Sequence, residues 1–449
     1  MKKFLALLLT LVLCLGLSAG FASAEEDVEV VQYYCSVGAY LIKLQEEIDK
    51  WNETTGAEEG VYIELISNIN TYGTDLEALM QAGTFFDLID VQTNRQTWIE
   101  RGWVKDLETI ENEELQALIE SYEPYIQNGI NIQGGMLFAL PLEVVPIKMA
   151  VNLDLFEKNN LELPETWDDV VECARIITEN GNGEEFGYGW STWSAMFRRL
   201  TFKATMNSTG RGWWDPNTET YDFSIYETPV KAIAEMYQNG WMLGADDLGI
   251  DEIRAQFAAG RVGMFPAPSY DYAVYTSQFP AECNWTVIDM PTFEEGEAPY
   301  KGVYLDRVNL SICAPAYDNS SDAHKEAIEK AFIFLNSDEL NASIYAMGGM
   351  IPYKMEIIEN TEVDESLGEQ WTLFSDLTNY ASVMLFPDNL LPLEGDTSET
   401  VMDSIMRGDL EWEDSVADLN ERYNAAYQQL KEEGDIDLSI YAYEYDISR

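Results

Sequence analysis

The residues that could act as nucleophiles, bases or phosphate ligands are few in this sequence. The single histidine, His324, begins an amphipathic stretch, and a Ser-His-Asp or Cys-His catalytic arrangement would have to use it. A histidine whose ring is satisfied at the protein surface is the commoner role for such a position. The chain contains neither a G-x-x-x-x-G-K-[ST] nor a G-x-G-x-x-G phosphate loop. The pattern therefore favours neither a nucleophilic hydrolase nor a nucleotide-binding enzyme.

Metal and thiol chemistry are also disfavoured. The acidic runs at Asp246-Asp247 and 318–322 lack the glycine and the terminal glutamate of a calcium loop. The cysteines beyond the N-terminal segment lie far apart and have no metal-ligand spacing. We therefore expect no metal and no cofactor. We interpret the remaining cysteines as free, buried thiols: Cys35, Cys173, Cys283 and Cys313.

Carboxylates are abundant, with 80 acidic against 26 basic residues. A glycosidase needs only two carboxyl groups at a set separation. A sequence does not give that separation, so a secreted, carboxylate-dependent glycan hydrolase stays open as an alternative function.

Aromatic rings and planar polar groups are the other side chains that could form a binding site. The chain has 12 Trp, 25 Tyr and 18 Phe. A sugar presents apolar C–H faces to rings and hydroxyl edges to planar polar groups. Large cores use rings too, so position must decide which of them face a ligand. Gln92, Asn94 and Arg95 follow the apolar run FDLIDV (86–91), at the strand end where α/β sheets bind ligands.

The elements that would position these groups alternate between strands and helices. The segments 28–37, 61–69 and 86–91 are typical of strands. A helical face runs from Leu41 to Trp51, and a second helix runs from Thr74 to a stop at Gly83. This order predicts a parallel sheet with helices on both faces.

The alternation continues along the chain. We predict strands at 136–140, 147–151 and 307–315, and helices over 229–260, 324–336 and 412–431. In LELPETWDDVVECARIITENG (161–181), Thr166 is an N-cap that can form a capping box with Asp169. Gly181 suits a left-handed helix stop. We expect Trp167 to pack this helix against the sheet.

The composition and the N-terminus indicate a folded, exported protein. The formal net charge is -54 and 46% of the residues are hydrophobic, which disfavours disorder and nucleic-acid binding. Lys2 and Lys3 precede an apolar stretch that ends in a small-residue cleavage site, so we expect a signal peptide over 1–24. Leu13 is too large for a lipobox before Cys14, so we expect no lipid anchor.

Several motifs in order along the chain resemble those of the family 1 extracellular solute-binding proteins of ABC importers, the group that contains maltodextrin-binding protein. The central ones are Leu140-Pro141, then VNLDLF (151–156), then PETWD (164–168). The others are LMQAGTFFDLI (79–89), GWVKDL (102–107), FAAGRVGM (257–264) and GGMIP (348–352). The resemblance covers nearly all of the expected mature chain, although Val151 and Leu153 replace the usual Tyr and Lys.

The resemblance implies an α/β, two-lobed periplasmic-binding-protein type II fold. Each lobe would be a mainly parallel sheet flanked by helices, and a three-segment hinge would join them. Extended segments near Pro141, Pro291 and Pro352 are the candidate crossings. We place lobe 1 at 25–143 plus 298–352 and lobe 2 at 144–297 plus 353–449.

The resemblance also implies ligand-binding residues between the lobes. Tyr270 matches the family ring that faces the sugar, Tyr272 lies close behind, and Arg95 aligns with a family arginine. Asn94 stands where the maltodextrin binder has an acid, and Glu143 is assigned from its place on the first hinge strand, although the family's acid aligns with Val145. The loop after GYGW adds Trp190 and Trp193, whereas Trp213 and Trp214 would edge the cleft or form a surface ridge.

The expected function is capture of a sugar or oligosaccharide and its delivery to ABC transporter permease subunits, by a monomer without catalytic activity. The protein would act outside the cell or in the cell envelope, periplasmically if an outer membrane is present. Besides the hydrolase, a polyamine or peptide binder of the same fold and a sensory binding protein remain alternatives.

Overall fold

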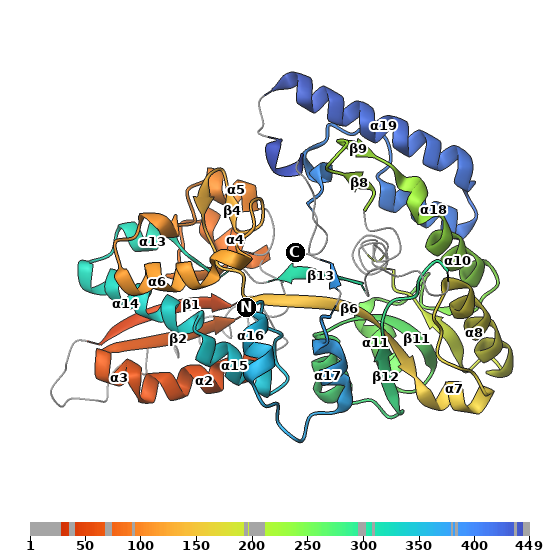
Figure 1. Ribbon diagram of the computed structural model, residues 1–449, viewed down its shortest axis with the longest axis horizontal. Coiled ribbons are helices and arrows are strands. Elements are labelled where there is room, and N and C mark those ends of the chain that lie inside the picture. Colours follow the sequence, from red (N-terminus) through yellow and green to blue (C-terminus); the bar gives the residue numbers. More distant parts are fainter. Residues whose placement is uncertain are drawn as a thin grey trace, which may run out of the picture.

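Two lobes, joined by extended strands, make up the molecule (Figure 1). The computed structural model describes residues 28–35, 41–67, 74–91, 95–192, 196, 212–294, 302–307, 310–378, 380–381, 385–434 and 438–442. The expected signal peptide, 1–24, lies outside the described residues. We call lobe 1 the part around the first sheet and lobe 2 the part around the second, larger sheet.

Lobe 1 is built on a four-stranded sheet with the strand order β14-β3-β1-β2. The first three strands of the chain run parallel, as the sequence predicted, and the fourth runs antiparallel beside β3. The strands are β1 (Glu29–Cys35), β2 (Val61–Ser67), β3 (Leu88–Asp90) and β14 (Leu310–Ile312). The last of them covers only part of the predicted strand 307–315.

Apolar cores lie on both faces of this sheet because neighbouring residues of a strand point to opposite sides. Tyr33 belongs to the core that contains Leu44 and Ile48, whereas Tyr34 belongs to the other, with Trp98. The helices of lobe 1 are α2 (Leu41–Glu53), α3 (Thr55–Glu59), α4 (Thr74–Gln81), α5 (Arg95–Glu100), η1 (Leu107–Thr109), α6 (Glu113–Tyr122), η2 (Glu123–Tyr125), α13 (Ala314–Asp318), α14 (Asp322–Leu335), α15 (Asp338–Ala346) and α16 (Met355–Asn360). A small hairpin joins β4 (Ile132–Gln133) to β5 (Met136–Leu137).

Lobe 2 contains a seven-stranded sheet that runs β10-β7-β11-β6-β13-β15, with β12 also paired to β6. Its strands are β6 (Glu143–Asn152), β7 (Phe186–Gly189), β10 (Met242–Leu243), β11 (Val262–Pro268), β12 (Trp285–Ile288), β13 (Gly302–Arg307) and β15 (Tyr380–Ala381). The strands β7, β10 and β11 are parallel, but β6 runs antiparallel to all three of its neighbours. The sheet is therefore more mixed than the expected, mainly parallel one, because β6 enters it from lobe 1.

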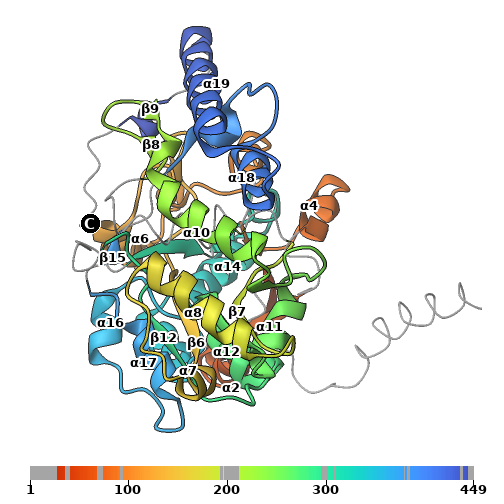
Figure 2. The same cartoon turned by 90° about the vertical axis from the view of Figure 1, so that its right-hand side faces the viewer.

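Helices flank this second sheet, and the long α19 extends along one end of lobe 2 (Figure 2). The helices are α7 (Leu153–Asn159), α8 (Trp167–Asn180), η4 (Phe223–Tyr226), α10 (Glu227–Gln238), α11 (Ile250–Ala258), α12 (Asp271–Ala273), the π-helical turn η5 (Val274–Gln278), α17 (Glu369–Ser375), η6 (Pro387–Leu390), α18 (Ser398–Arg407), α19 (Trp412–Glu433) and η7 (Ser439–Tyr441). A hairpin of β8 (Trp214–Asp215) and β9 (Thr220–Tyr221) packs on α19.

Two local predictions in lobe 2 need correction. The single helical region predicted over 229–260 is two helices, because Gly240 turns at φ +72° and Met242–Leu243 then pairs with β7 as β10. Gly181 at the end of α8 has φ −79°, and the left-handed residues are the next two, Asn182 and Gly183.

The start of α8 is confirmed. Thr166 and Asp169 form the predicted capping box, and Trp167 is completely buried in the lobe 2 core.

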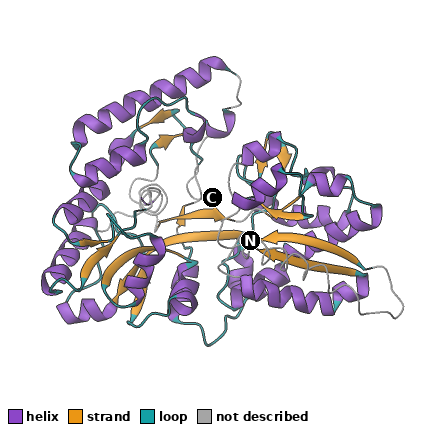
Figure 3. Cartoon of the chain, turned by 180° about the vertical axis from the view of Figure 1, so that it is seen from behind, coloured by secondary structure: helices purple, strands orange, loops and turns teal. Residues whose placement is uncertain are grey.

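Three chain segments form an antiparallel ribbon between the lobes, which we call the connecting ribbon (142–146, 304–307 and 351–353) (Figure 3). The amide of Val144 donates to the carbonyl of Ile351 at 3.0 Å, and β13 pairs along the other edge of β6. Leu142 belongs to a lobe 1 core and Val144 to the lobe 2 core. The lobe boundaries placed by sequence stay a prediction.

Proline marks two of the three segments of the ribbon. Pro141 directly precedes the first segment, and Pro352 lies within the last one, opposite Glu143. Pro291 instead lies beside the start of α8, where the carbonyl of Thr292 accepts a hydrogen bond from the amide of Trp167. The third segment is β13, ten residues and more beyond Pro291.

Candidate ligand-binding site

The parallel strands of both sheets bring chemistry-bearing residues together at their carboxyl ends, where α/β sheets bind ligands. In lobe 1 the residues directly after β1 and β2 are 36–40 and 68–73, and those after β3 and the buried Val91 are 92–94; these three segments are not described. The predicted site residue Asn94 is among them. Arg95 begins α5, but its side chain lies outside the description.

The strand that leads to residues 92–94 is fixed by a buried hydrogen bond. Asp90 is the last residue of β3 and is 2% exposed, and it accepts from the hydroxyl of Tyr33 at 2.8 Å. This bond attaches the end of β3 to β1 at the edge where the ligand is expected.

Glu143 is the first residue of β6 and lies in the connecting ribbon. It pairs in register with Arg307 on one side and forms a bridge to Pro352 on the other. The residue is only 1% exposed, so its carboxylate is buried in this conformation.

In lobe 2 the loop after β11, which we call the Tyr270 loop (Ser269–Tyr272), is held at three points. The amide of Ser269 donates to the carbonyl of Pro146 in the connecting ribbon at 3.0 Å. Asp271 is completely buried, and the hydroxyl of Tyr272 accepts from the amide of Gly368 at 3.1 Å. Within these four residues only Tyr270 is not buried, so it is the side chain that the loop can offer to a ligand.

Tyr272 supports this loop from the lobe 2 core. It is 5% exposed, and its ring centroid lies 5.3 Å from that of Trp371. The prediction that Tyr272 contacts the ligand remains a prediction, and its observed contacts are those of a core residue.

A buried ion pair fixes the Tyr270 loop to α11. The Nη2 of Arg254 lies 2.6 Å from Oδ1 of Asp271, and Nη1 lies 3.1 Å from Oδ1 of Asp251. The guanidinium carbon also lies 5.7 Å from the ring centroid of Tyr270. Burial is the largest single influence and acts to lower the pKa of Arg254, but Asp271 together with Tyr270, Tyr275 and Asp251 outweighs it, and the pKa is raised.

Trp190 follows β7 directly, and Trp193, the other ring predicted for this loop, lies outside the described residues. Trp190 is 2% exposed and stacks on Tyr188 with ring centroids 6.4 Å apart. Its amide donates to the carbonyl of Leu243, and the amide of Thr192 donates to that of Leu248. The segment after β10 therefore supports the segment after β7.

Trp213 and Trp214 are buried, and neither forms the surface ridge that the sequence left open. The indole of Trp213 donates to Oδ2 of Asp388 at 3.0 Å and stacks on Phe386 with centroids 4.3 Å apart. The indole of Trp214 donates to the carbonyl of Tyr441. These rings attach the β8–β9 hairpin to the C-terminal segments of lobe 2.

Sequence reasoning missed Arg254 and Asp271. A signal for Arg254 was present, because Ile250, Ile253, Arg254 and Phe257 follow the i, i+3, i+4, i+7 spacing of a buried helical face. An arginine at such a position requires a buried partner. Nothing local identified Asp271 as that partner, since 17 residues separate the two along the chain.

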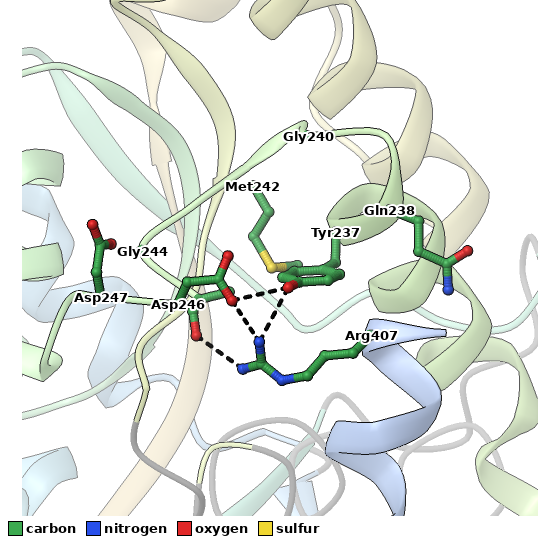
Figure 4. A pocket seen from close by; sticks show the side chains of 9 residues that line it. Tyr237, Gln238, Gly240, Met242, Gly244, Asp246, Asp247 and Arg407 are labelled. Atoms are coloured by element: carbon green, nitrogen blue, oxygen red, sulfur yellow. Dashed lines mark hydrogen bonds and ion pairs between the residues drawn. The ribbon is translucent and has the colours of Figure 1, made fainter. Parts of the chain in front are cut away.

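A cavity of about 520 Å³ lies elsewhere in lobe 2, between the ends of α10 and α18 and the edge strand β10 (Figure 4). Its polar groups bind one another: Arg407 donates to Asp246 at 2.5 Å and to the hydroxyl of Tyr237 at 3.1 Å. No residue of the predicted site lines it. We therefore assign these polar groups a structural role: they hold together α10, α18 and the segment after β10.

His324 lies at the start of α14 with both ring nitrogens engaged, which confirms it as a satisfied histidine. Nδ1 lies 2.7 Å from a carboxylate oxygen of Glu29, and Nε2 lies 3.2 Å from one of Asp87. Burial acts to lower the pKa of His324, but the two carboxylates outweigh it and the pKa is raised.

The four cysteines that the structure describes are free thiols; Cys35, Cys173 and Cys313 are buried as predicted, whereas Cys283 is only partly buried. Burial raises the pKa of Cys173 and of Cys313 to about 12, so these thiols are poor nucleophiles near neutral pH. Across the part of the chain that the structure describes, no helix is long and apolar enough to cross a membrane.

Comparison with known proteins relates this architecture to a protein family and to solved structures. The family model described as bacterial extracellular solute-binding protein matches residues 39–342. No curated protein sequence matches the chain. The solved structures that resemble it include RafE in complex with raffinose, with 19% identity and a TM-score of 0.61 over 89% of this chain and 99% of the other.

Two further solved structures show the same fold. The GacH receptor of Streptomyces glaucescens, studied unliganded and with acarbose, has 14% identity and a TM-score of 0.69 over 89% of this chain and 99% of its own. The sugar-binding protein MalE from Xanthomonas citri has 14% identity and a TM-score of 0.63 over 91% of this chain and 100% of its own. At this level of identity the likeness establishes the two-lobed type II fold.

Proposed function

The chain belongs to the family of bacterial extracellular solute-binding proteins, and on that premise we propose that it captures a carbohydrate between its two lobes. The exported protein then delivers this ligand, chemically unchanged, to the permease subunits of an ABC importer. The observation that carries the proposal is the Tyr270 loop, which is anchored to the connecting ribbon and leaves one ring unburied.

The chemistry of the loop fits a sugar. A tyrosine ring offers an apolar face to the C–H groups of a pyranose and a hydroxyl to its edge. Four solved structures of this fold carry the names of sugars in their titles: raffinose, acarbose, cycloalternan and tagatose. An anionic ligand is disfavoured, because the chain has 26 basic residues against 80 acidic ones.

Ligand capture is a matter of relative affinity for two states. A ligand that contacts both lobes favours the closed arrangement only by the difference between its affinities for the closed and open forms. The residues predicted to contact the ligand are Asn94 and Arg95 of lobe 1, Glu143 of the ribbon, and Trp190, Trp193, Tyr270 and Tyr272 of lobe 2. Of these we place Tyr270 against the ligand, since Glu143, Trp190 and Tyr272 are buried in this conformation.

Isothermal titration calorimetry tests this function. The panel contains raffinose, maltotriose, acarbose and tagatose, with spermidine and a neutral hexapeptide as representatives of the other ligand classes. We expect a saccharide to bind and to be recovered unchanged by chromatography after prolonged incubation. Binding of spermidine or the peptide alone would reassign the ligand class, and cleaved sugar would make the protein a hydrolase.

A single substitution connects the binding to the site. Tyr270→Ala should weaken the saccharide that binds best by roughly tenfold or more, because one stacked ring contributes about 1–3 kcal/mol at a binding site. The matched control is Tyr62→Ala, since Tyr62 is 45% exposed on β2 of lobe 1. Equal losses of affinity in the two variants would remove Tyr270 from the site.

A further inference from the structure

Arg254 stands apart from the other arginines whose side chains the structure describes. Among the described residues the buried basic side chains are Lys148, Arg254 and Lys354, so Arg254 is the buried arginine of this set, with 8% exposure. Burying an ion pair gives little net stability, because desolvation of both charges offsets their attraction. Such a pair does fix the relative position of the two segments that carry its charges. Here it fixes the Tyr270 loop to α11.

The guanidinium is held in one orientation by two carboxylates. Nη2 and Nε face the two oxygens of Asp271 at 2.6 and 3.4 Å, and Nη1 faces Asp251 one helical turn earlier at 3.1 Å. A planar group bonded along two edges cannot rotate without breaking these bonds.

This fixed group reaches Tyr270 in two ways. It binds Asp271, the next residue in the chain, and so fixes the backbone on the C-terminal side of Tyr270. It also places its guanidinium carbon 5.7 Å from the ring centroid of Tyr270, within cation–π distance. Both contacts come from α11, a rigid helix whose Ile253 and Phe257 are completely buried.

We propose that Arg254 is a positioning residue of the ligand site, which fixes the ring of Tyr270 in its binding orientation before any ligand arrives. The effect on affinity rests on the proposed function, whereas the effect on the ring does not. A ring that is ordered in advance loses less conformational freedom on binding, so a ligand that uses it binds more tightly.

The test uses a variant that spares the fold. R254Q/D271N replaces the ion pair with two neutral amides, so that no lone charge remains in the core. R254K retains the positive charge but loses the planar fork. The control is R261Q, because Arg261 is an exposed arginine just beyond α11 whose Nη1 binds Gln256.

The first readout needs no ligand. With 3-fluorotyrosine placed at position 270, the fluorine resonance of the sugar-free protein should be displaced from that of free 3-fluorotyrosine. R254Q/D271N should move the resonance toward the free value or broaden it, R254K should lie between, and R261Q should match the parent. A resonance that is unchanged in R254Q/D271N overturns the proposal, whatever the protein binds.

The second readout is affinity for the panel saccharide that binds best. R254Q/D271N should weaken it by roughly two- to tenfold, since the ring of Tyr270 must then be ordered when the saccharide binds. In a Tyr270→Ala background the same pair of substitutions should cause no further loss, and an additional full loss would show that Arg254 acts elsewhere. If no saccharide binds the parent while the fluorine resonance still responds, the positioning role holds and the proposed function fails.

Discussion

At the scale of single residues, His324 joins three elements of lobe 1. Its ring lies between Glu29 on β1 and Asp87 just before β3. His324 itself lies in the first turn of α14, which begins at Asp322 after the N-cap Ser321. Asp87 also accepts from the amide of Gln32 at 2.8 Å, so the same carboxylate holds β1. The protonated imidazole is the form that both carboxylates favour.

The consequence is a pH dependence of stability. Because the folded state raises the pKa of His324, the stabilisation is complete below the unfolded pKa of about 6.5 and is lost as the pH rises through the folded value. His324→Gln should therefore lower Tm by on the order of 1–2 °C at pH 6. The difference between parent and variant should shrink by pH 9. A difference that grows with pH would contradict this account.

Single residues of the site were only partly predictable from sequence. The i, i+3, i+4, i+7 spacing carried a signal for a buried Arg254 that went unused, whereas the family resemblance singled out Tyr270. The burial of Trp190 and Tyr272 was not predictable, because it depends on segments far away along the chain: the amide of Trp190 binds the carbonyl of Leu243, and the ring of Tyr272 packs on Trp371. Position in a loop suggests an exposed ring, but the packing of distant segments decides it.

At the scale of elements, Gly244 lets the segment after β10 pack closely against the segment after β7. It has φ +95°, and a Cβ at this position would lie 2.6 Å from the carbonyl oxygen of Trp190. Gly240, on the other side of β10, has φ +72° with nothing within 4 Å of such a Cβ. The two glycines share a left-handed backbone and differ in what surrounds them.

Alanine substitutions at Gly240 and Gly244 separate the cost of backbone strain at positive φ from the cost of displacing the Trp190 carbonyl. Gly240→Ala should cost about 1 kcal/mol of unfolding free energy from the positive φ. Gly244→Ala should cost at least about 1 kcal/mol more, because the Trp190 carbonyl must move. Urea denaturation measures both, and equal costs would show that the Trp190 segment yields freely.

The start of α8 offers a second test at this scale. Thr166→Ala removes the hydroxyl that accepts from the amide of Asp169 and should lower the unfolding free energy by about 1 kcal/mol. Thr166→Ser keeps the hydroxyl and should retain most of that stability. A serine variant as unstable as the alanine variant would assign the loss to the methyl group instead.

Elements with strong local signals were predicted well. The strands β1, β2 and β3, the capping box of α8 and the helix α19 follow from apolar periodicity and capping residues. The short strand β10 was not predicted, because two residues carry no periodicity and become a strand only by pairing with β7. The antiparallel placement of β6 likewise depends on long-range pairing with β11, β12 and β13.

At the scale of the whole molecule, a buried lysine lies on each side of the connecting ribbon. On the lobe 1 side, Lys354 binds Asp338 at 2.7 Å and lies 3.9 Å from the ring centroid of Tyr122. On the lobe 2 side, Lys148 binds Asp289 at 2.7 Å and lies 5.0 Å from that of Tyr380. We therefore expect each lysine to fix the ribbon to one lobe and bending between the lobes to be confined to the ribbon residues between them.

Hydrogen exchange measured by mass spectrometry tests these two anchors. Lys354→Met should speed exchange in the peptide that spans 351–357 and leave the lobe 2 part of β6 unchanged. Lys148→Met should do the reverse, and each variant serves as the control for the other. If either variant speeds exchange on both sides alike, the ribbon moves as one unit and the lysines do not delimit the bend.

Solution scattering tests the central claim most directly, namely that the two lobes close on a carbohydrate. Small-angle X-ray scattering of the protein alone and with each saccharide of the panel measures the radius of gyration. The account predicts that the saccharide that binds in calorimetry reduces the radius of gyration, and that this compaction is lost at the same sugar concentration in Tyr270→Ala. A bound saccharide that leaves the radius of gyration unchanged would contradict capture between the lobes.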